Sequence, residues 1–236
     1  MDQQTAVEQN SKEASLLEKK IHRRKFFKFS SVAVASAAFI ASCGKDDDDN
    51  DGVNLGSGDV GILNYAYALE QLEAAFYTQV VANAGFSTTF SADERIFLTD
   101  IRDHEIAHRE FFKTAITAAA AASIIPALEV DFSTINFTNK ANVLGTAMAF
   151  EDLGVSAYNG AGYLLKDAKN LLLAGKIVSV EARHAALIRE LVAANSFLGD
   201  QVDAASVNIS RTPLEVLAIA DTYIVTKINA SNLPTG

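Results

Sequence analysis

Two short stretches of the sequence, EIAH and EARH, each place a histidine three residues after a glutamate. Residues three apart lie on one face of a helix, so Glu105 would project together with His108. In the same way, Glu181 would project together with His184. A carboxylate beside an imidazole can bind a metal ion, although a single pair of this kind is more often a surface ion pair. The chain has only four histidines, so two such pairs favour a shared role as metal ligands.

The helices that would carry these pairs belong to an internal repeat. The segment LNYAYALEQLEAAFY at residues 63–77 aligns without a gap on LGTAMAFEDLGVSAY at residues 144–158. Identical residues at equivalent positions of the two segments are Leu63 and Leu144, Ala66 and Ala147, Ala68 and Ala149, Glu70 and Glu151, Leu72 and Leu153, and Tyr77 and Tyr158. Each segment precedes one of the Glu-x-x-His stretches, so the chain predicts one helix pair used twice.

Two such helix pairs packed as a four-helix bundle would bring four carboxylates and two imidazoles together. The expected metal ligands are Glu70, Glu105, His108, Glu151, Glu181 and His184. Carboxylates can bridge two cations, while imidazoles select a transition metal over calcium or magnesium. Without cations, several negative charges would lie in an apolar interior, which is unfavourable. The sequence therefore predicts two transition-metal ions, iron or manganese, as cofactors.

Other residues near these positions leave alternatives open. Glu73 lies one turn after Glu70 and is the alternative ligand from the first helix, although its repeat equivalent is Gly154. His104 points about 100° away from Glu105 around a helix and would lie at the surface or support a ligand.

Two tyrosines are also candidates for a role at the site. Tyr77 and Tyr158 each stand seven residues, about two helical turns, after the glutamate of their own segment. They would hydrogen-bond the ligands, carry a radical, or simply pack in the core.

The wider sequence predicts helices and little else. Ala, Leu, Val and Ile are abundant, and the chain has only three prolines. Ser91 with Glu94, and Thr212 with Glu215, have the spacing of capping boxes at helix starts. The expected helices cover residues 59–84, 91–122, 140–165 and 167–197, with a looser segment at 123–139 and a fifth helix from Thr212. The predicted fold class is an all-α four-helix bundle with a fifth, C-terminal helix.

The first 43 residues differ in composition from the rest and are expected to be an export signal. A basic segment is followed by an apolar run that is too short to span a bilayer. Arg23 and Arg24 lie in a stretch that resembles the twin-arginine export motif, and IASC resembles a lipobox that would leave Cys43 lipidated. Residues 44–58 are acidic and polar, which predicts a flexible tether, and residues 59–236 would form the bundle domain. The acidic cluster also resembles the signal that sends some bacterial lipoproteins to the cell surface.

Charge and cysteine content exclude several functions. After residue 43 the chain has 13 basic and 25 acidic residues, a net charge of −12, which argues against nucleic acid or anionic lipid as partners. The expected membrane contact is the lipid anchor alone, at the periplasmic or cell-surface side of a bacterial membrane. Cys43 is the single cysteine, so the domain has no disulfide, no catalytic thiol and no rubredoxin-type iron site.

The chain resembles the ferritin-like superfamily, and most of all the exported bacterial ferritin-like proteins akin to plant desiccation-related proteins. The stretches LEQLEAAFY, EIAH, AFEDLGVSAYNGA and VEARHAALIR carry this resemblance over residues 60–195. It implies a four-helix bundle with a carboxylate-bridged pair of metals, held by the six residues given above.

Two hypotheses about function follow from these residues and this resemblance. One is an envelope oxidoreductase that handles peroxide, dioxygen or ferrous iron, of the peroxidase, catalase or ferroxidase type. The other is a non-enzymatic metal-binding or desiccation-protective protein. A closed storage cage is not expected, because a lipid tether on every subunit would fit poorly in such a shell.

Overall fold

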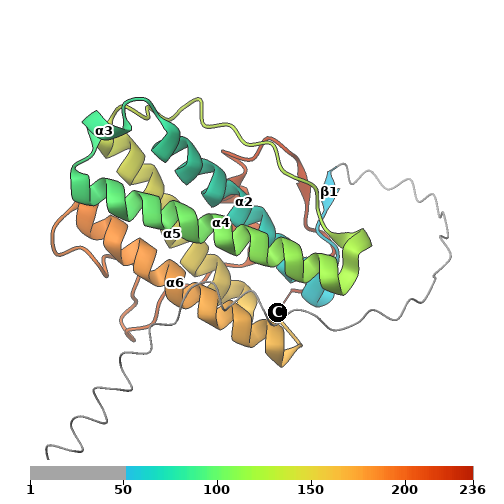
Figure 1. Cartoon of the computed structure of the whole chain (residues 1–236). Coiled ribbons are helices and arrows are strands. Elements are labelled where there is room, and N and C mark those ends of the chain that lie inside the picture. Colours follow the sequence, from blue (N-terminus) through green and yellow to red (C-terminus); the bar gives the residue numbers. More distant parts are fainter. Residues whose placement is uncertain (1–51, 236) are drawn as a thin grey trace, which may run out of the picture. The chain divides into compact units, whose positions relative to one another are not determined.

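The computed structural model describes residues 52–235 of the chain. Four long helices dominate this part: α2 (Gly58–Ala82), α4 (Ala92–Ala120), α5 (Lys140–Gly162) and α6 (Ala168–Val192). α2 packs along α4 and α5 packs along α6, so the bundle consists of two helix pairs (Figure 1). A shorter helix, α7 (Pro213–Ala220), follows near the C-terminus. The predicted all-α bundle of two helix pairs with a fifth helix is confirmed.

The helices begin where the sequence supplies capping groups. At the start of α4 the Ser91 side chain accepts from the Glu94 backbone N–H, and the Glu94 carboxylate accepts from the Ser91 backbone N–H. Thr212 and Glu215 form the same box at α7, with Pro213 at the first helical position. Both predicted capping boxes are therefore present.

The two helices within each pair differ in burial. α2 and α5 are buried around most of their circumference, as expected of helices that are apolar on all sides. α4 and α6 instead bury one stripe. In α4 the buried residues are Leu98, Ile101, Glu105, Phe112 and Ile116, and in α6 they are Ile177, Glu181, His184, Ala185, Ile188 and Arg189. In both outer helices, a glutamate thus occupies a position that would ordinarily carry an apolar residue.

A crossing segment at residues 124–139 connects α4 to α5 and runs along the bundle (Figure 1). Two buried amides of α2 hold it in place. The Asn64 amide donates to the Ser123 carbonyl (2.7 Å) and accepts from the Ile125 N–H (3.2 Å). The Gln71 amide oxygen accepts from the Leu128 N–H at 2.8 Å. These bonds pair backbone groups at residues 123–128 with the two buried amides of α2.

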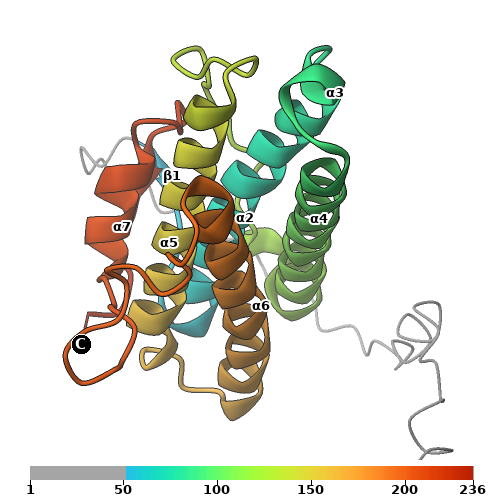
Figure 2. The ribbon, with the colours of Figure 1, turned by 90° about the vertical axis from the view of Figure 1, so that its left-hand side faces the viewer.

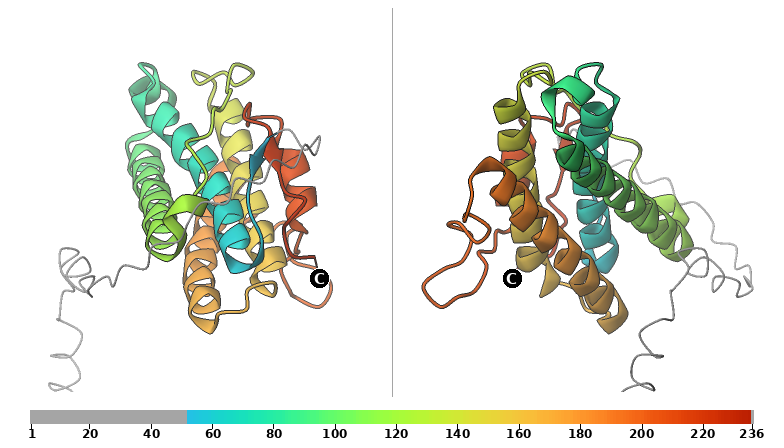
Figure 3. Two further views of the ribbon diagram at one scale, coloured as in Figure 1. Left: turned by 90° about the vertical axis from the view of Figure 1, so that its right-hand side faces the viewer. Right: turned by 60° about the vertical axis from the view of Figure 1, so that its left-hand side comes forward.

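The C-terminal residues cover the second helix pair. Figure 2 shows α7 on the outer side of α5, with α4 on the opposite side of the bundle. β1 (Val53–Asn54) pairs in parallel with β2 (Ile228–Asn229), and Figure 3 shows β1 beside the C-terminal segment. α3 (Phe86–Thr89) and a 3₁₀ turn, η2 (Ala121–Ser123), complete the elements of the described residues.

Two predicted boundaries need correction. The expected tether extends to residue 58, yet Val53 and Asn54 form β1 and Leu55 is fully buried, so the folded domain begins before Asp59. The fourth predicted helix extends to residue 197, whereas α6 ends at Val192 because Ala193 adopts an extended conformation. The local sequence has no proline or glycine there to mark that end.

The predicted export signal at residues 1–43, including Cys43, lies outside the described residues, as does most of the tether. Among residues 52–235, none of the helices combines the length and hydropathy needed to cross a bilayer.

Candidate metal centre

The six predicted ligands lie together in the middle of the bundle. They form two overlapping groups, in each of which one ligand atom per residue lies within 4.8 Å of the others. One group consists of Glu70, Glu105, His108 and Glu181, and the other of Glu105, Glu151, Glu181 and His184. Each group has one imidazole and three carboxylates. Glu105 and Glu181 belong to both groups, which is the arrangement that two bridging carboxylates would need.

The distances follow the approximate symmetry of the repeat. His108 Nδ1 lies 2.7 Å from Glu181 Oε1 and 3.5 Å from Glu70 Oε2. His184 Nδ1 lies 2.7 Å from Glu105 Oε1 and 3.5 Å from Glu151 Oε2. Each histidine is thus closest to the glutamate of the opposite Glu-x-x-His pair. The two halves of the repeat are interleaved in one site.

The atoms facing the centre lack hydrogen-bond partners. Within the described residues, the buried polar atoms without a partner include both carboxylate oxygens of Glu105 and Glu181, Oε2 of Glu70 and Glu151, and Nδ1 of both histidines. The short nitrogen to oxygen contacts do not have the direction that a hydrogen bond requires. Because native proteins rarely leave so many buried polar atoms unpaired, this donor set fits metal cations.

Burial governs the acidity of these carboxylates. Burial, followed by the nearby charge of Glu181, raises the pKa of Glu105 to about 8. Burial also opposes ionisation of Glu181, but the close imidazoles of His108 and His184 bring its pKa down to about 2. Burial likewise disfavours charge on His184, but Glu151 and the other carboxylates raise its pKa to about 12. Nearby positive charge therefore strongly stabilises the ionised carboxylates of the cluster, and a metal ion would supply that charge.

Each of the two tyrosines makes a hydrogen bond to the other half of the repeat. Tyr77 on α2 donates a hydrogen bond to Glu151 Oε1 on α5 at 2.5 Å, and Tyr158 on α5 donates to Glu70 on α2. Burial raises the pKa of both phenols well above the usual value. Each tyrosine therefore supports the glutamate of the other segment, whereas the sequence spacing related it to the glutamate of its own.

The structure also separates Glu70 from its alternative. Glu70 belongs to a ligand group and Glu73 does not, although both are buried on α2. Glu73 lies against α5, where a Cβ added to Gly154 would be 2.9 Å from Glu73 Oε1. Burial, together with the charges of Glu105 and Glu181, raises the pKa of Glu73 well above its usual value. Glu73 thus adds a fifth acidic group beside the four carboxylates of the cluster, and this group favours the protonated form.

His104 lies exposed on α4 and also contacts a candidate ligand, so it has both of the positions that the sequence predicted as alternatives. Its Nδ1 lies 2.9 Å from Nε2 of His184, and the two rings stack at an interplanar angle of 12°. Nδ1 of His184 faces the cluster, so its Nε2–H can donate a hydrogen bond to Nδ1 of His104. This bond would fix the orientation of the His184 ring. The spacing on α4 alone could not reveal this contact, because His184 comes from α6.

A groove between α4 and α6 leads to the two histidines. It has a volume of about 440 Å³, and its lining includes His104, His108, Arg183 and His184. Contacts between α4 and α6 are sparse, which leaves this side of the bundle open. The side chains of His108 and His184 are 12% and 6% exposed, so the imidazoles form the part of the cluster nearest to solvent.

A comparison with family models gives a match to the ferritin-like domain over residues 58–194, more than half of the chain. The chain belongs to the ferritin-like domain family. The matched region begins with α2 and ends just after α6, so it contains all four long helices and all six clustered residues of this ferritin-like domain. A search of curated proteins gives no match.

Proposed function

We propose that this ferritin-like domain binds two iron or manganese ions and acts as an envelope oxidoreductase on peroxide, dioxygen or ferrous iron. The observation that carries the proposal is the pair of overlapping groups of buried ligand atoms that share Glu105 and Glu181. The ions would bind to Glu70, Glu105, His108, Glu151, Glu181 and His184. Bound in this way, they would supply the electron transfer that reduction of an oxidant requires.

The residues of the chain would contribute orientation and proton control. Tyr77 and Tyr158 hold Glu151 and Glu70 by hydrogen bonds, which limits the freedom of these carboxylates. Glu73, whose pKa is raised well above its usual value by burial and by the charges of Glu105 and Glu181, favours the protonated form beside the cluster. The groove between α4 and α6 gives polar molecules such as peroxide a path to the imidazole side of the site.

The proposal is tested by metal analysis of the purified protein followed by addition of peroxide. Two ions per chain and rapid oxygen release would indicate a catalase-type reaction. Peroxide consumption that depends on added ferrous iron would indicate a ferroxidase-type reaction. A protein that retains two ions but is inert to peroxide, dioxygen and ferrous iron would contradict the enzyme proposal.

A non-enzymatic role is the second candidate, and the buried charge of the cluster favours it. Four carboxylates in the core are costly without cations, so bound metal would stabilise the bundle even without turnover. A desiccation-protective protein of the type that the sequence resembles would need this stability alone. A large rise in melting temperature on metal binding, combined with the absence of turnover, would favour this candidate.

We also propose that the protein is exported and anchored by a lipid on Cys43. The basic stretch with Arg23 and Arg24, the short apolar run and the IASC sequence support this proposal. Cys43→Ser should abolish metabolic labelling with palmitate and release the protein from the membrane fraction. Replacement of both Arg23 and Arg24 by lysine should block export if the twin-arginine route is used. Unchanged labelling in Cys43→Ser would contradict the anchor.

A further inference from the structure

Exposed apolar side chains cluster at both ends of α6. Near its start, Leu171, Leu172 and Leu173 are 46%, 60% and 36% exposed, and these three residues form the leucine patch. Just beyond its end, Phe197 and Leu198 are 54% and 53% exposed. Apolar side chains that cluster on a surface are typical of a contact with another molecule or with a membrane. Both ends of α6 are therefore candidates for such a contact.

The leucine patch is surrounded by lysines. Residues 163–176 contain Lys166, Lys169 and Lys176, all of them exposed, and a single acidic residue, Asp167. Salt screens charges that lie farther apart than about 10 Å, so this surface responds to its own lysines more than to the acidic total of the chain. The leucine patch can therefore approach an anionic surface.

The other end of α6 has the opposite local charge. Residues 191–210 contain Asp200 and Asp203 but no lysine or arginine. Arg189, which precedes this range, forms ion pairs with Asp152 and Asp200, so two carboxylates offset its charge. Of the two apolar clusters, only the leucine patch thus combines apolar side chains with a local excess of positive charge.

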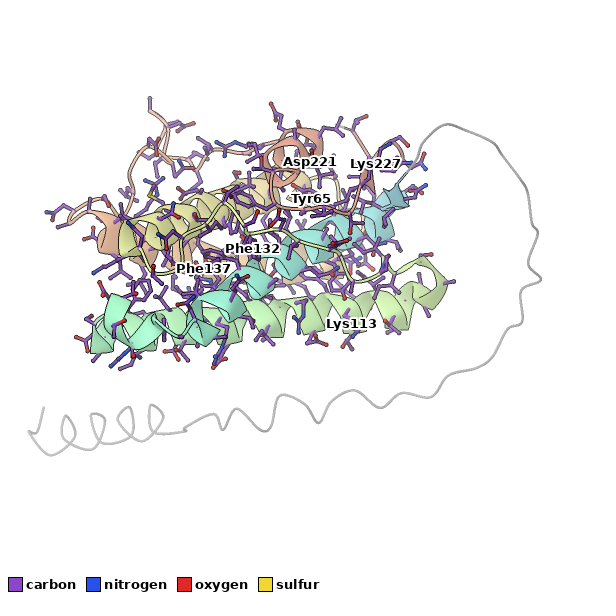
Figure 4. The ribbon with its side chains drawn as sticks, turned by 90° about the horizontal axis from the view of Figure 1, so that it is seen from above. Tyr65, Lys113, Phe132, Phe137, Asp221 and Lys227 are labelled. Carbon is purple, nitrogen blue, oxygen red and sulfur yellow. The ribbon has the colours of Figure 1, made fainter. Side chains whose placement is uncertain are left out.

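The leucine patch lies at the end of the bundle where the chain enters the described residues. The Asp59 carboxylate, in the first turn of α2, accepts hydrogen bonds from the backbone N–H groups of Lys166 and Asp167 just before α6. The Val53 N–H donates to the Lys227 carbonyl at 2.8 Å, and Figure 4 shows Lys227 beside β1. Figure 1 shows β1 and the start of α6 at one end of the bundle, and α3 at the other.

The length of the connection to Cys43 favours the same end. Gly52 is the ninth residue after Cys43, and nine residues span at most ~32 Å when fully extended. α6 has 25 residues and is therefore ~37 Å long. A lipid on Cys43 would thus hold the start of α6 closer to the membrane than the end of α6 at Val192.

We propose that the leucine patch binds the surface of the membrane in which the lipid on Cys43 is anchored. The leucine side chains would lie at the boundary between headgroups and acyl chains, and the lysines would contact anionic headgroups. This inference rests on the proposed anchor, and it adds a second, protein-mediated contact that orients the domain. The groove between α4 and α6, whose lining on α6 begins at Val180, would then lie farther from the membrane than the patch.

The contact is tested with a tryptophan probe, because the chain contains no tryptophan of its own. Leu172→Trp is prepared as the mature lipidated protein in vesicles of phosphatidylethanolamine and phosphatidylglycerol, with and without brominated acyl chains. Bromine quenches a tryptophan that it contacts, so we expect an emission shift to shorter wavelength and a loss of intensity in the brominated vesicles. Phe197→Trp, at a similarly exposed position beyond the other end of α6, is the matched control and should not be quenched.

Two outcomes of this experiment would overturn the proposal. One is an unchanged emission of Leu172→Trp in brominated vesicles, and the other is quenching of Phe197→Trp in its place. Palmitate labelling of the same samples reports the anchor separately. Labelled protein without quenching of Leu172→Trp would contradict the contact and leave the anchor standing, whereas unlabelled protein would contradict the anchor and with it this inference.

The role of the lysines is tested in the Leu172→Trp background. Lys169→Glu combined with Lys176→Glu should reduce the quenching in vesicles that contain phosphatidylglycerol, because both changes place negative charge against anionic headgroups. The same pair of changes should have little effect in vesicles of phosphatidylcholine alone, which carry no net charge. Equal quenching with and without the two changes in the anionic vesicles would overturn the contribution of the lysines.

Discussion

The two helix pairs of this protein are most alike at the layer of the ligands and differ immediately around it. Glu70 matches Glu151, and the two Glu-x-x-His stretches match each other, so each half supplies the same donors. Around this layer, Glu73 faces Gly154 across the bundle. The position equivalent to His104 is Val180 in the second Glu-x-x-His helix.

The candidate ligands and the residues around them are under different constraints. The two cations of the proposed function would need similar donors from both sides, which accounts for the match between the halves at the candidate ligands. The surrounding residues control orientation, protonation and access, and these can differ between two ions that are not required to react alike. For the two ions of the proposed function, the differences at His104 and Glu73 therefore predict unequal binding positions.

The largest effect is expected at the carboxylates that both ligand groups share. Glu105→Ala should weaken binding of both ions by at least ~100-fold, beyond the effect typical of residues that only support a ligand. Glu70→Ala should weaken mainly the ion bound next to His108. Metal content and titration calorimetry measure both effects, with Glu110→Ala as an exposed control on the same helix. Loss of only one ion in Glu105→Ala would show that this carboxylate does not bridge.

The acidity of the site predicts a pH dependence of stability. Burial raises the pKa of Glu105 to about 8, above the value near 4.3 of an unfolded chain. A metal-free folded protein therefore retains this proton where the unfolded chain has lost it, and its stability should fall as the pH rises from about 5 to 8.

The pH dependence of stability that Glu181 contributes has the opposite sign to that of Glu105. The pKa of Glu181 is lowered to about 2, so its contribution is present above about pH 4 and is lost as the pH falls toward 2. Metal ions require deprotonated ligands, so their stabilising effect should grow from about pH 5 to 8. Melting temperatures with and without a chelator measure this difference. Equal pH profiles in the two states would contradict the assignment of these carboxylates as ligands.

An effect of intermediate size is expected at His104, and it tests whether the two ions are bound unequally. His104→Phe retains a stacking ring but removes the acceptor for Nε2 of His184, so we expect a ~10–100-fold loss of affinity for the ion next to His184. His104→Gln retains an acceptor and should recover part of the affinity. Competitive metal titrations distinguish the two ions, and unchanged affinity in His104→Phe would exclude a positioning role.

The smallest expected effect concerns the contact between Glu73 and Gly154. Gly154→Ala would place a Cβ 2.9 Å from Glu73 Oε1 and should cost ~1–2 kcal/mol of stability, a cost that a Glu73→Ala background should relieve. Gly145→Ala is the matched control on the same helix, because a Cβ there meets nothing within 4 Å. It should stabilise the protein by ~0.5–1 kcal/mol through helix propensity. Denaturation curves of these four variants measure the coupling, and an additive result would exclude the contact.

Several features of the fold were predictable because they depend on local rules. Helix periodicity predicted the four long helices, and the side chains at 91 and 212 predicted two helix starts. The end of α6 and the pairing of β1 with β2 were missed. Both features depend on contacts with distant segments, such as the parallel pairing of Val53 with Ile228.

By itself, the sequence determined which six residues come together, because a spacing of three on a helix and a repeated segment both convert directly into shared faces. Only the tertiary structure decided that Glu70 and not Glu73 joins a ligand group, and that each tyrosine supports the glutamate of the other segment. It also decided the contact of His104 with His184. These features arise between helices, where the distance between two side chains depends on the packing of the whole bundle and not on their separation along the chain.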